Sequence, residues 1–197
     1  MVYKVTGIIG SPRKKMNTDT LVTSALAGAR SAGVETEKIY LNDLNIMPCQ
    51  ACRKFPAPAY CFFHDGMDKI YDALESADGI VIGTPAYFAS FSAQLKLIID
   101  RSNCLAEMTT KSDGRLIFKS RLKKRKKGIF IWVANISKDP VHALEPIRIW
   151  CKYFANIELI EVLTVLESDS GEGAMNNKAL IDKAFNLGVL LGEKANS

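Results

Sequence analysis

The segment from residue 10 to residue 18 carries the side chains best suited to binding a phosphate group. It reads Gly-Ser-Pro-Arg-Lys-Lys-Met-Asn-Thr and joins an apolar, strand-like run to a segment with helical spacing. The N-terminus of a helix offers unpaired backbone N–H groups and a partial positive charge, which together suit an anion. Ser11, Asn17 and Thr18 add side-chain donors, and Arg13 adds a planar, charged donor. The alternative is an ordinary helix start, in which Asn17 and Thr18 cap the helix and the lysines face solvent.

A second segment, from residue 83 to residue 96, could hold a flat ring. It reads Gly-Thr-Pro-Ala-Tyr-Phe-Ala-Ser-Phe-Ser-Ala-Gln-Leu-Lys and follows a short apolar run. Tyr87 and Phe88 lie beside a predicted turn, where aromatic side chains could flank a planar ligand and free backbone N–H groups could bond its polar edge. The alternative is that both side chains simply pack under the edge of a sheet.

The chain has five cysteines, an odd number for a disulfide scaffold. Cys49, Cys52 and Cys61 are clustered, whereas Cys104 and Cys151 stand apart in the sequence. The first residues enter a strand-like pattern directly, without the basic and apolar regions of a secretory signal. We therefore expect free thiols in a reducing compartment, and a cytoplasmic protein.

The formal net charge of +5 is concentrated in a basic run between residues 115 and 127. Its members are Arg115, Lys119, Arg121, Lys123, Lys124, Arg125, Lys126 and Lys127. Such a run can attract nucleic acid or another polyanion, or it can be a solvated connection before a strand. Because it lacks interleaved aromatic residues and a recognisable nucleic-acid module, we expect the solvated connection and no nucleic-acid partner. No apolar run approaches the ~20 residues of a membrane-spanning helix, so no membrane partner is expected.

Apolar periodicity predicts strands that alternate with helices along the whole chain. The strands are expected at residues 2–9, 35–41, 79–83, 128–134 and 158–165. The helices are expected at residues 17–33, 66–76, 92–105, 140–154 and 177–195. Between the second strand and the second helix lies a long irregular stretch, which contains the three clustered cysteines.

This alternation predicts an α/β fold with a five-stranded parallel sheet in the order 2-1-3-4-5 and helices on both faces. We expect residues 1–197 to form a single domain, in which residues 42–64 are a cysteine-containing loop insertion. In such sheets, ligands bind at the carboxyl ends of the strands where the strand order reverses. The rule points to the loops after Ile9, Gly83 and Ala134. The first of these loops lacks the glycine patterns of ATP-binding and dinucleotide-binding loops.

Taken together, the two segments resemble the NAD(P)H-dependent FMN reductases, a family of flavodoxin-like proteins. The motifs are Gly-Ser-Pro-Arg followed by Asn-Thr, and then Thr-Pro-x-Tyr-Phe and Ser-Ala-Gln-Leu-Lys-x-x-Ile-Asp-Arg. The chain looks especially similar to the branch that includes the iron–sulfur flavoproteins. The similarity covers residues 1 to about 105 closely, and the remainder only in the order of strands and helices. It implies a flavodoxin-like fold that binds FMN in this single domain.

The resemblance also implies where the cofactor binds. The FMN phosphate would be held by Ser11, Arg13, Asn17 and Thr18. The isoalloxazine ring would lie against Pro85, Ala86, Tyr87 and Phe88. The loop after the fourth strand, near Asn135 and Ile136, would close the other side, although it lacks the glycines often seen there. Lys15 and Met16 stand where family members often carry a small residue, so a stiffer loop is expected.

The chemistry that the resemblance implies belongs to the flavin. Hydride would move from NAD(P)H to the flavin N5, and electrons would then move to a small-molecule acceptor such as a quinone, a free flavin or a nitro compound. No side chain is required as an acid or base. We expect Asp100 and Arg101 to form a structural pair at a helix end, and His64 and His142 to be structural. The family further implies a homodimer or homotetramer.

The clustered cysteines match the motif of the iron–sulfur flavoproteins only in part. That motif is Cys-x2-Cys-x2-Cys with a fourth cysteine several residues later. Cys49 and Cys52 match the first two places and Cys61 fits the fourth, but the third place is Phe55. Iron–sulfur clusters are usually held by four thiolates, so we expect neither a cluster nor another metal, although His64 could complete a site for a cluster or zinc. The loop would then cover the flavin or form a subunit interface; a redox pair of Cys49 and Cys52 is an alternative.

Three functions follow from these observations. The leading hypothesis is an FMN-dependent NAD(P)H oxidoreductase. The second is a non-catalytic electron-transfer flavoprotein that works with a protein partner. The third is a flavodoxin-like fold used as a binding or regulatory module, with the basic run as its contact surface.

Overall fold

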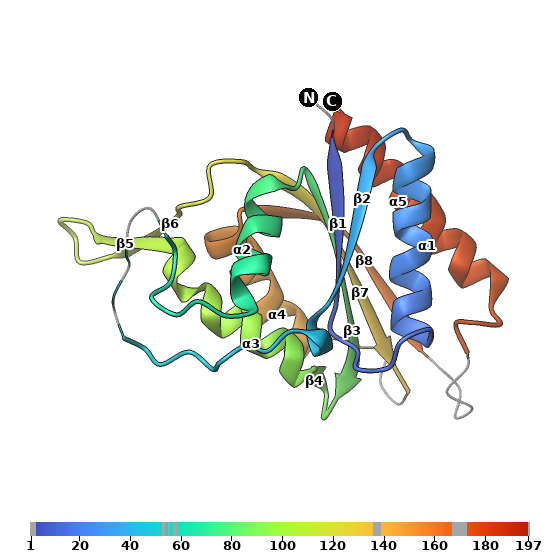
Figure 1. The fold of residues 1–197 in the computed structure, drawn as a ribbon, viewed down its shortest axis with the longest axis horizontal. Helices are drawn as coiled ribbons and strands as arrows, with labels where there is room; N and C mark the ends of the chain where they lie inside the picture. Colours follow the sequence, from blue (N-terminus) through green and yellow to red (C-terminus); the bar gives the residue numbers. More distant parts are fainter. Residues whose placement is uncertain are drawn as a thin grey trace.

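The computed structural model describes residues 3–52, 54, 56, 59–135, 139–166 and 173–196. Within these residues, a parallel sheet has the strand order β2-β1-β3-β7-β8 (Figure 1). Its strands are β1 (Lys4–Ile9), β2 (Glu35–Tyr40), β3 (Gly79–Tyr87), β7 (Lys126–Ala134) and β8 (Ile157–Leu166). All neighbours in this order pair in parallel. Counted along the chain these strands are in the order 2-1-3-4-5, so the predicted sheet is confirmed.

The three central strands are covered on both faces. β1, β3 and β7 consist mainly of apolar residues, and most of these are buried. A continuous apolar run is what a parallel strand between two layers of helices requires. The register aligns Ile9 with Gly83 on β3, and Pro85 with Val133 on β7. The loops that follow β1, β3 and β7 therefore all begin at the same edge of the sheet.

Helices cover both faces of the sheet (Figure 1). One face packs against α1 (Asn17–Ser31) and α5 (Lys178–Asn196), and the other against α2 (Met67–Ser76), α3 (Ala93–Arg101) and α4 (Val141–Trp150). Helices α1 and α5 approach closely at two glycines: a Cβ on Gly188 would overlap the Ala25 carbonyl, and one on Gly28 would overlap the Phe185 carbonyl. Among the described helices, none combines the length and the apolar character needed to cross a membrane.

Several short elements connect the main strands and helices or divide the predicted helices. The 3-10 turn η1 (Leu41–Asp43) follows β2, β4 (Ser90–Phe91) pairs with the end of β3, and η2 (Ser102–Leu105) follows α3. Helix α4 ends at Trp150 and continues as a π-helical turn, η3 (Cys151–Ala155), which stops at Asn156 in a left-handed conformation. The helices expected at residues 92–105 and 140–154 are thus each divided into two segments.

A two-stranded hairpin projects from the body of the molecule (Figure 1). β5 (Ala106–Thr110) and β6 (Leu116–Ser120) pair antiparallel and form a sheet of their own. The basic run was expected to be a solvated connection; its first part is exposed but forms a strand, and its last part is neither fully exposed nor a connection. The apolar sequence Leu116 to Phe118 gives the first part enough strand propensity to form β6. The last part begins β7, where Lys126 is buried.

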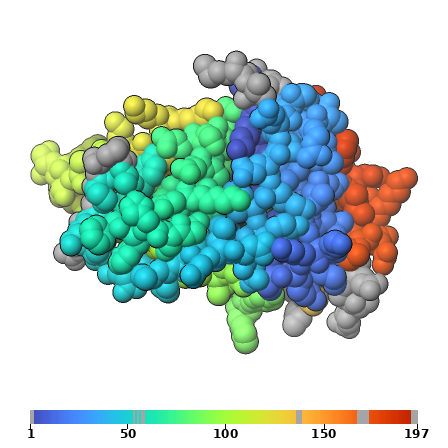
Figure 2. Space-filling model, viewed as in Figure 1, coloured from blue at the N-terminus to red at the C-terminus, as the bar shows by residue number. Residues whose placement is uncertain are grey.

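We call residues 42–64 the cysteine loop, and its described residues run over the surface on the α2 side. Figure 2 shows this stretch, in cyan to teal, spread over the front of the molecule between α1 and the hairpin. Its described part contains little regular structure apart from η1 at its start. The loop therefore depends on side-chain contacts with other elements for its position.

Candidate functional site

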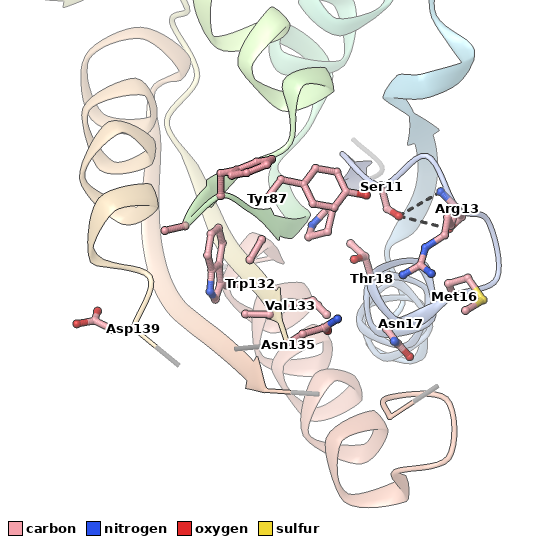
Figure 3. A pocket seen from close by; sticks show the side chains of 15 residues that line it. Ser11, Arg13, Met16, Asn17, Thr18, Tyr87, Trp132, Val133, Asn135 and Asp139 are labelled. Atoms are coloured by element: carbon pink, nitrogen blue, oxygen red, sulfur yellow. Dashed lines mark hydrogen bonds between the residues drawn. The ribbon is translucent and has the colours of Figure 1, made fainter. Parts of the chain in front are cut away.

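The carboxyl edge of the sheet holds a pocket of about 520 Å³ (Figure 3). Its walls come from the loops after β1 and β3 and from the end of β7, where the strand order predicts a ligand site. All nine residues assigned to cofactor binding from the sequence line it: Ser11, Arg13, Asn17, Thr18, Pro85, Ala86, Tyr87, Phe88 and Asn135. The fold thus brings together three separate parts of the chain. Ile136, which was expected beside Asn135, lies outside the described residues.

The phosphate loop (residues 10–18) leaves β1 in close contact with β3. The Gly10 N–H donates a hydrogen bond to the Gly83 carbonyl at 2.8 Å. A Cβ on Gly10 would come within 2.9 Å of Ser92 Oγ, so this tight exit favours glycine. Ser11 is buried, and its Oγ accepts a hydrogen bond from the Arg13 N–H at 3.2 Å (Figure 3). Arg13 itself is exposed at the pocket wall, where its guanidinium can reach a ligand.

Asn17 and Thr18 are the first two residues of α1, and both are buried. The residue that precedes the helix is Met16, whose backbone is extended. The alternative in which Asn17 and Thr18 cap the helix is therefore wrong, because both already have helical positions. Asn17 Oδ1 accepts a hydrogen bond from the Ala174 N–H at 3.1 Å, which ties the start of α1 to the chain before α5. The N-terminal end of α1 thus borders the pocket, as an anion site requires.

Asp19 is a buried carboxylate that fixes the shape of the phosphate loop. Its Oδ2 accepts the N–H of Lys15 at 2.6 Å, and Lys15 has the left-handed φ of 60°. Three further donors reach the carboxylate: Lys38 Nζ at 3.0 Å, Tyr40 OH at 2.8 Å and Thr23 Oγ1 at 3.0 Å. Burial by itself would raise the pKa of Asp19, but these hydrogen bonds outweigh it, and the pKa is lowered. The sequence signal for this role is an acid in the first turn of a helix.

The segment from residue 83 to residue 96 turns back sharply at the pocket mouth. β3 and β4 pair antiparallel, and Phe88 and Ala89 at the turn have φ values of 50° and 57°. Two left-handed residues in succession favour glycine or asparagine, so this turn is strained. Tyr87 is 43% exposed and Phe88 is fully exposed. The alternative in which both pack under the sheet edge is therefore wrong, and both side chains stand at the opening of the pocket.

Sequence reasoning missed the wall that β7 supplies. Trp132, Val133 and Ala134 line the pocket, and Asp139 lies at its rim (Figure 3). The Trp132 side chain is almost fully buried, and no described residue forms a hydrogen bond with its indole Nε1. Asp139 Oδ1 accepts the N–H of Val141, the first residue of α4, at 2.9 Å. A tryptophan within a buried strand looks like core in the sequence, so only its place in the lining of the pocket, near the end of β7, identifies it.

Asp100 and Arg101 do not pair with each other. Asp100 accepts a hydrogen bond from Lys96, one helical turn earlier, at 2.7 Å. Arg101 is buried, and its Nη1 donates to Asp65 Oδ2 at 2.6 Å. The expected pair is wrong because adjacent residues of a helix point in different directions. The partner of Arg101 thus lies in the segment before α2.

The two histidines lie outside the pocket lining. His64 is exposed, and its Nδ1 lies 3.2 Å from Asp68 Oδ2, a residue of the first turn of α2. His142 is exposed in the first turn of α4. Neither arrangement resembles a catalytic pair.

The clustered cysteines belong to a different cavity. Cys49 and Cys52 are exposed, Cys61 is half-buried, and all three share this cavity with the buried Cys104. Phe55 lies outside the described residues, but phenylalanine has no atom that could bind a metal. In the described part of the chain, no group of three or more His, Cys, Asp and Glu residues is placed to hold a metal ion. The cysteine loop itself thus supplies three of the four thiolates that usually hold an iron–sulfur cluster.

The fold and the pocket first define a class of protein. A doubly wound parallel sheet with an anion-suited helix start at its switch point is the architecture of flavodoxin-like, nucleotide-binding proteins. The model of the family described as NADPH-dependent FMN reductase matches residues 3–127. Since this is more than half of the chain, the chain belongs to that family.

Curated relatives agree with the branch that the motifs indicated. The chain is 39% identical to the iron–sulfur flavoprotein of Methanosarcina thermophila over 99 residues, which are 50% of this chain and 52% of the relative. It is 44% identical to an iron–sulfur flavoprotein of Methanocaldococcus jannaschii over 102 residues, 52% of this chain and 53% of the relative. The chain thus matches about half the length of these relatives. Among solved structures, a flavone reductase shares the fold with a TM-score of 0.71 and 23% identity, over 98% of this chain and 63% of that chain.

Proposed function

We propose that this chain binds FMN in the pocket at the carboxyl edge of the sheet and passes electrons from NAD(P)H to a small acceptor. The observation that carries the proposal is the division of the pocket into two ends. Buried polar side chains and the start of α1 lie on one side of the pocket, Trp132 lies on the other, and the Tyr87 ring lies between them (Figure 3). The volume of about 520 Å³ suits a small-molecule cofactor. Membership of the FMN reductase family supports the choice of FMN.

The polar end is suited to the phosphate of FMN. Ser11, Asn17 and Thr18 are buried, so a hydrogen bond between them and an anion is shielded from competing water. The exposed Arg13 supplies a cation that can bond two phosphate oxygens at once. The α1 dipole adds a partial positive charge at the same place.

The apolar end is suited to the flavin ring. Pro85, Ala86 and Tyr87 offer one wall and Trp132 and Val133 another, so water is excluded from the ring over much of its area. When bound, FMN supplies the redox chemistry, which is hydride uptake and electron release. The side chains of this pocket position the ring, and no proton donor among them is needed for that role.

We infer that the acceptor is a flat molecule such as a quinone, a free flavin or a nitro compound, which can stack where the nicotinamide stacks. We also propose a homodimer or homotetramer, in which a neighbouring subunit covers the exposed Tyr87 and Phe88 at the pocket mouth. The free thiols of the chain support a location in the reducing cytoplasm.

A second candidate is an electron-transfer flavoprotein that exchanges electrons with a protein partner. It is favoured by the names of the curated relatives, which are iron–sulfur flavoproteins at 39% and 44% identity. The cysteine motif of the loop lacks its third cysteine, because Phe55 stands there, so we infer that such a protein would work through FMN alone.

An absorption experiment tests these proposals. The purified protein is titrated with FMN, and then NADPH or NADH is added without oxygen. Tight FMN binding followed by bleaching of the flavin bands supports the reductase. FMN that binds but does not bleach with either nicotinamide supports the electron carrier. Failure to bind FMN at micromolar concentrations would contradict both.

A further inference from the structure

A second cavity, of about 30 Å³, brings four cysteines together. Cys49, Cys52 and Cys61 come from the cysteine loop, and Cys104 comes from η2. A cavity needs about 10–15 Å³ of such volume to hold one water molecule, so this one can admit a small molecule. Arg101 also lines it. Neither the proposed FMN pocket nor its chemistry uses these sulfur atoms.

Arg101 places a buried cation beside one of the sulfurs. Its side chain is only 1% exposed, and its Nη1 donates to Asp65 Oδ2 at 2.6 Å and to the Met47 carbonyl at 2.7 Å. Its Nη2 donates to Cys61 Sγ at 3.5 Å. Its Nε is buried and has no hydrogen-bond partner among the described residues. The guanidinium thus contacts Cys61 and keeps one N–H donor unused.

The other cysteines have different surroundings. Cys104 is buried, and burial raises the pKa of its thiol, which lies 3.2 Å from the hydroxyl of Tyr71. Cys151 is buried in the core, and burial raises its pKa as well. Cys49 and Cys52 are exposed at the surface. Cys61 combines partial exposure with a hydrogen bond from a cation, which is the environment of reactive cysteines.

We propose that Cys61 is a redox-active thiol, which hydrogen peroxide oxidises and which Cys49 or Cys52 then joins in a disulfide. A small, uncharged oxidant such as hydrogen peroxide suits a cavity of this volume, whereas a bulky disulfide compound acting as the oxidant does not. Arg101 is a positioning residue in this reaction. It holds the sulfur at the cavity and stabilises the negative charge of the attacking sulfur.

The chemical steps balance as follows. The Cys61 sulfur attacks one peroxide oxygen, so an S–O bond forms, the O–O bond breaks, and hydroxide leaves and takes up a proton to become water. The sulfur loses two electrons to the peroxide and becomes a sulfenic acid. The sulfur of Cys49 or Cys52 then attacks Cys61, so an S–S bond forms, the S–O bond breaks, and a second water is released. The unused Nε–H of Arg101 is suited to bond the sulfenate oxygen between these steps.

The test uses the full-length, reduced protein and hydrogen peroxide in equal amount. Samples are quenched with a thiol-alkylating reagent over time, and each cysteine is followed by peptide mass spectrometry. We expect Cys61 to lose its free thiol first and to appear in a disulfide with Cys49 or Cys52. In the C49S/C52S double variant, a sulfenic-acid trap should label Cys61 instead.

Matched variants separate reactivity from folding. In R101K the contact geometry is lost, and oxidation of Cys61 should slow about tenfold, as expected for loss of one charged hydrogen bond. Arg121 is the control: its Nη2 donates to the Ala59 carbonyl and its Nη1 to the Cys104 carbonyl, so it supports the same region without contacting Cys61. R121K should leave the rate unchanged. If R101K does not fold, C61S keeps the proposal testable, because it should abolish the disulfide while Cys49 and Cys52 stay reduced.

Two results would overturn the proposal. One is a Cys49–Cys52 disulfide that forms at the same rate in C61S. The other is equal oxidation of Cys61 in the wild type and in a folded R101K. The outcome is independent of the proposed FMN chemistry, because the R13A/N17A variant, in which FMN binding is weakened, should be oxidised at Cys61 at the wild-type rate.

Discussion

The phosphate loop and the cysteine loop each depend on one buried charged side chain, but the two charges reach over very different lengths of chain. Asp19 accepts the N–H of Lys15, only four residues earlier, and connects it to β2. Arg101 reaches Asp65, which lies 36 residues earlier, and Cys61, which lies 40 residues earlier. The first loop is therefore shaped by its own helix start, and the second by elements that the chain forms later.

A second arginine strengthens this contrast. Arg121, just after β6, donates to the Ala59 carbonyl and lies over the ring of Tyr60, with 5.0 Å between its Cζ and the ring centroid. The cysteine loop thus has two anchors from outside its own sequence and little regular structure of its own. Regions of this kind open at lower free energy than a helix start packed on a central strand. The comparison teaches that the shape of the phosphate loop is set largely by neighbouring residues, whereas the thiol site exists only in the complete fold.

The largest expected effect is a loss of FMN affinity when two side chains of the phosphate loop are removed. Arg13→Ala together with Asn17→Ala should weaken FMN binding by about 2–4 kcal/mol, because a charge-assisted and a neutral hydrogen bond are lost. Isothermal titration with FMN measures the change. Lys14→Ala is the matched control, because Lys14 pairs with Asp43 and does not line the pocket. Unchanged FMN affinity in the double variant would show that these residues do not bind the FMN phosphate.

The next largest effect is a loss of stability when Arg101, which anchors the cysteine loop, is replaced. Arg101→Met should lower the free energy of unfolding by about 2–3 kcal/mol, because it leaves the mostly buried Asp65 carboxylate without its cation. Urea unfolding measures the loss, and hydrogen exchange should rise first in residues 42–66. Arg121→Met, which removes carbonyl contacts only, should cost less. If exchange rises equally in the phosphate loop, the two regions are not independent.

A smaller effect is expected at Asp19. Asp19→Asn should lower the free energy of unfolding by about 1–2 kcal/mol. The charged carboxylate, which accepts hydrogen bonds from four donors, becomes a neutral amide. The folded pKa of Asp19 is lowered, so its stabilisation is complete above the unfolded pKa of about 3.9 and is lost as pH falls through the folded value. The difference between wild type and variant should therefore shrink between pH 5 and pH 2, as chemical unfolding at several pH values would show. A constant difference would mean that the charge contributes nothing.

The smallest effect on stability is expected at Lys126. This residue lies at the start of β7, outside both loops and at the opposite end of the sheet, so it serves as a reference for them. Burial and the charge of Lys124 lower the pKa of Lys126 to about 8. Below that pH the folded protein holds a buried charge, so Lys126→Met should stabilise it by about 1 kcal/mol at pH 7. The advantage should disappear as pH rises from 8 through the unfolded pKa of about 10.4, because the lysine is then neutral in both states. A destabilised variant at pH 7 would show that the bonds from Nζ to the Lys124 and Ala155 carbonyls outweigh the burial of the charge.

The sequence predicted the sheet and the pocket well, because both follow from local patterns. Apolar runs that end at Gly10 and Gly83, each followed by a helix or turn signal, locate β1 and β3, although β3 continues to Tyr87. The strand order then places those ends together, and the nine assigned residues line one pocket. The hairpin was missed because β6 is short and lies within a run of basic residues. The pairing of Arg101 with Asp65 could not be found, since no local pattern specifies the contact.

By itself, the sequence determined the alternation of strands and helices, the strands buried on both faces, and the helix start suited to an anion. These depend on periodicity and on backbone groups that neighbouring residues control. Only the tertiary structure decided that Trp132 forms a wall of the pocket, that Asp19 receives donors from β2, and that Cys104 joins the three clustered cysteines beside Arg101. Such contacts join residues that are far apart along the chain, and their formation is favoured only when the packed core has already brought the elements together.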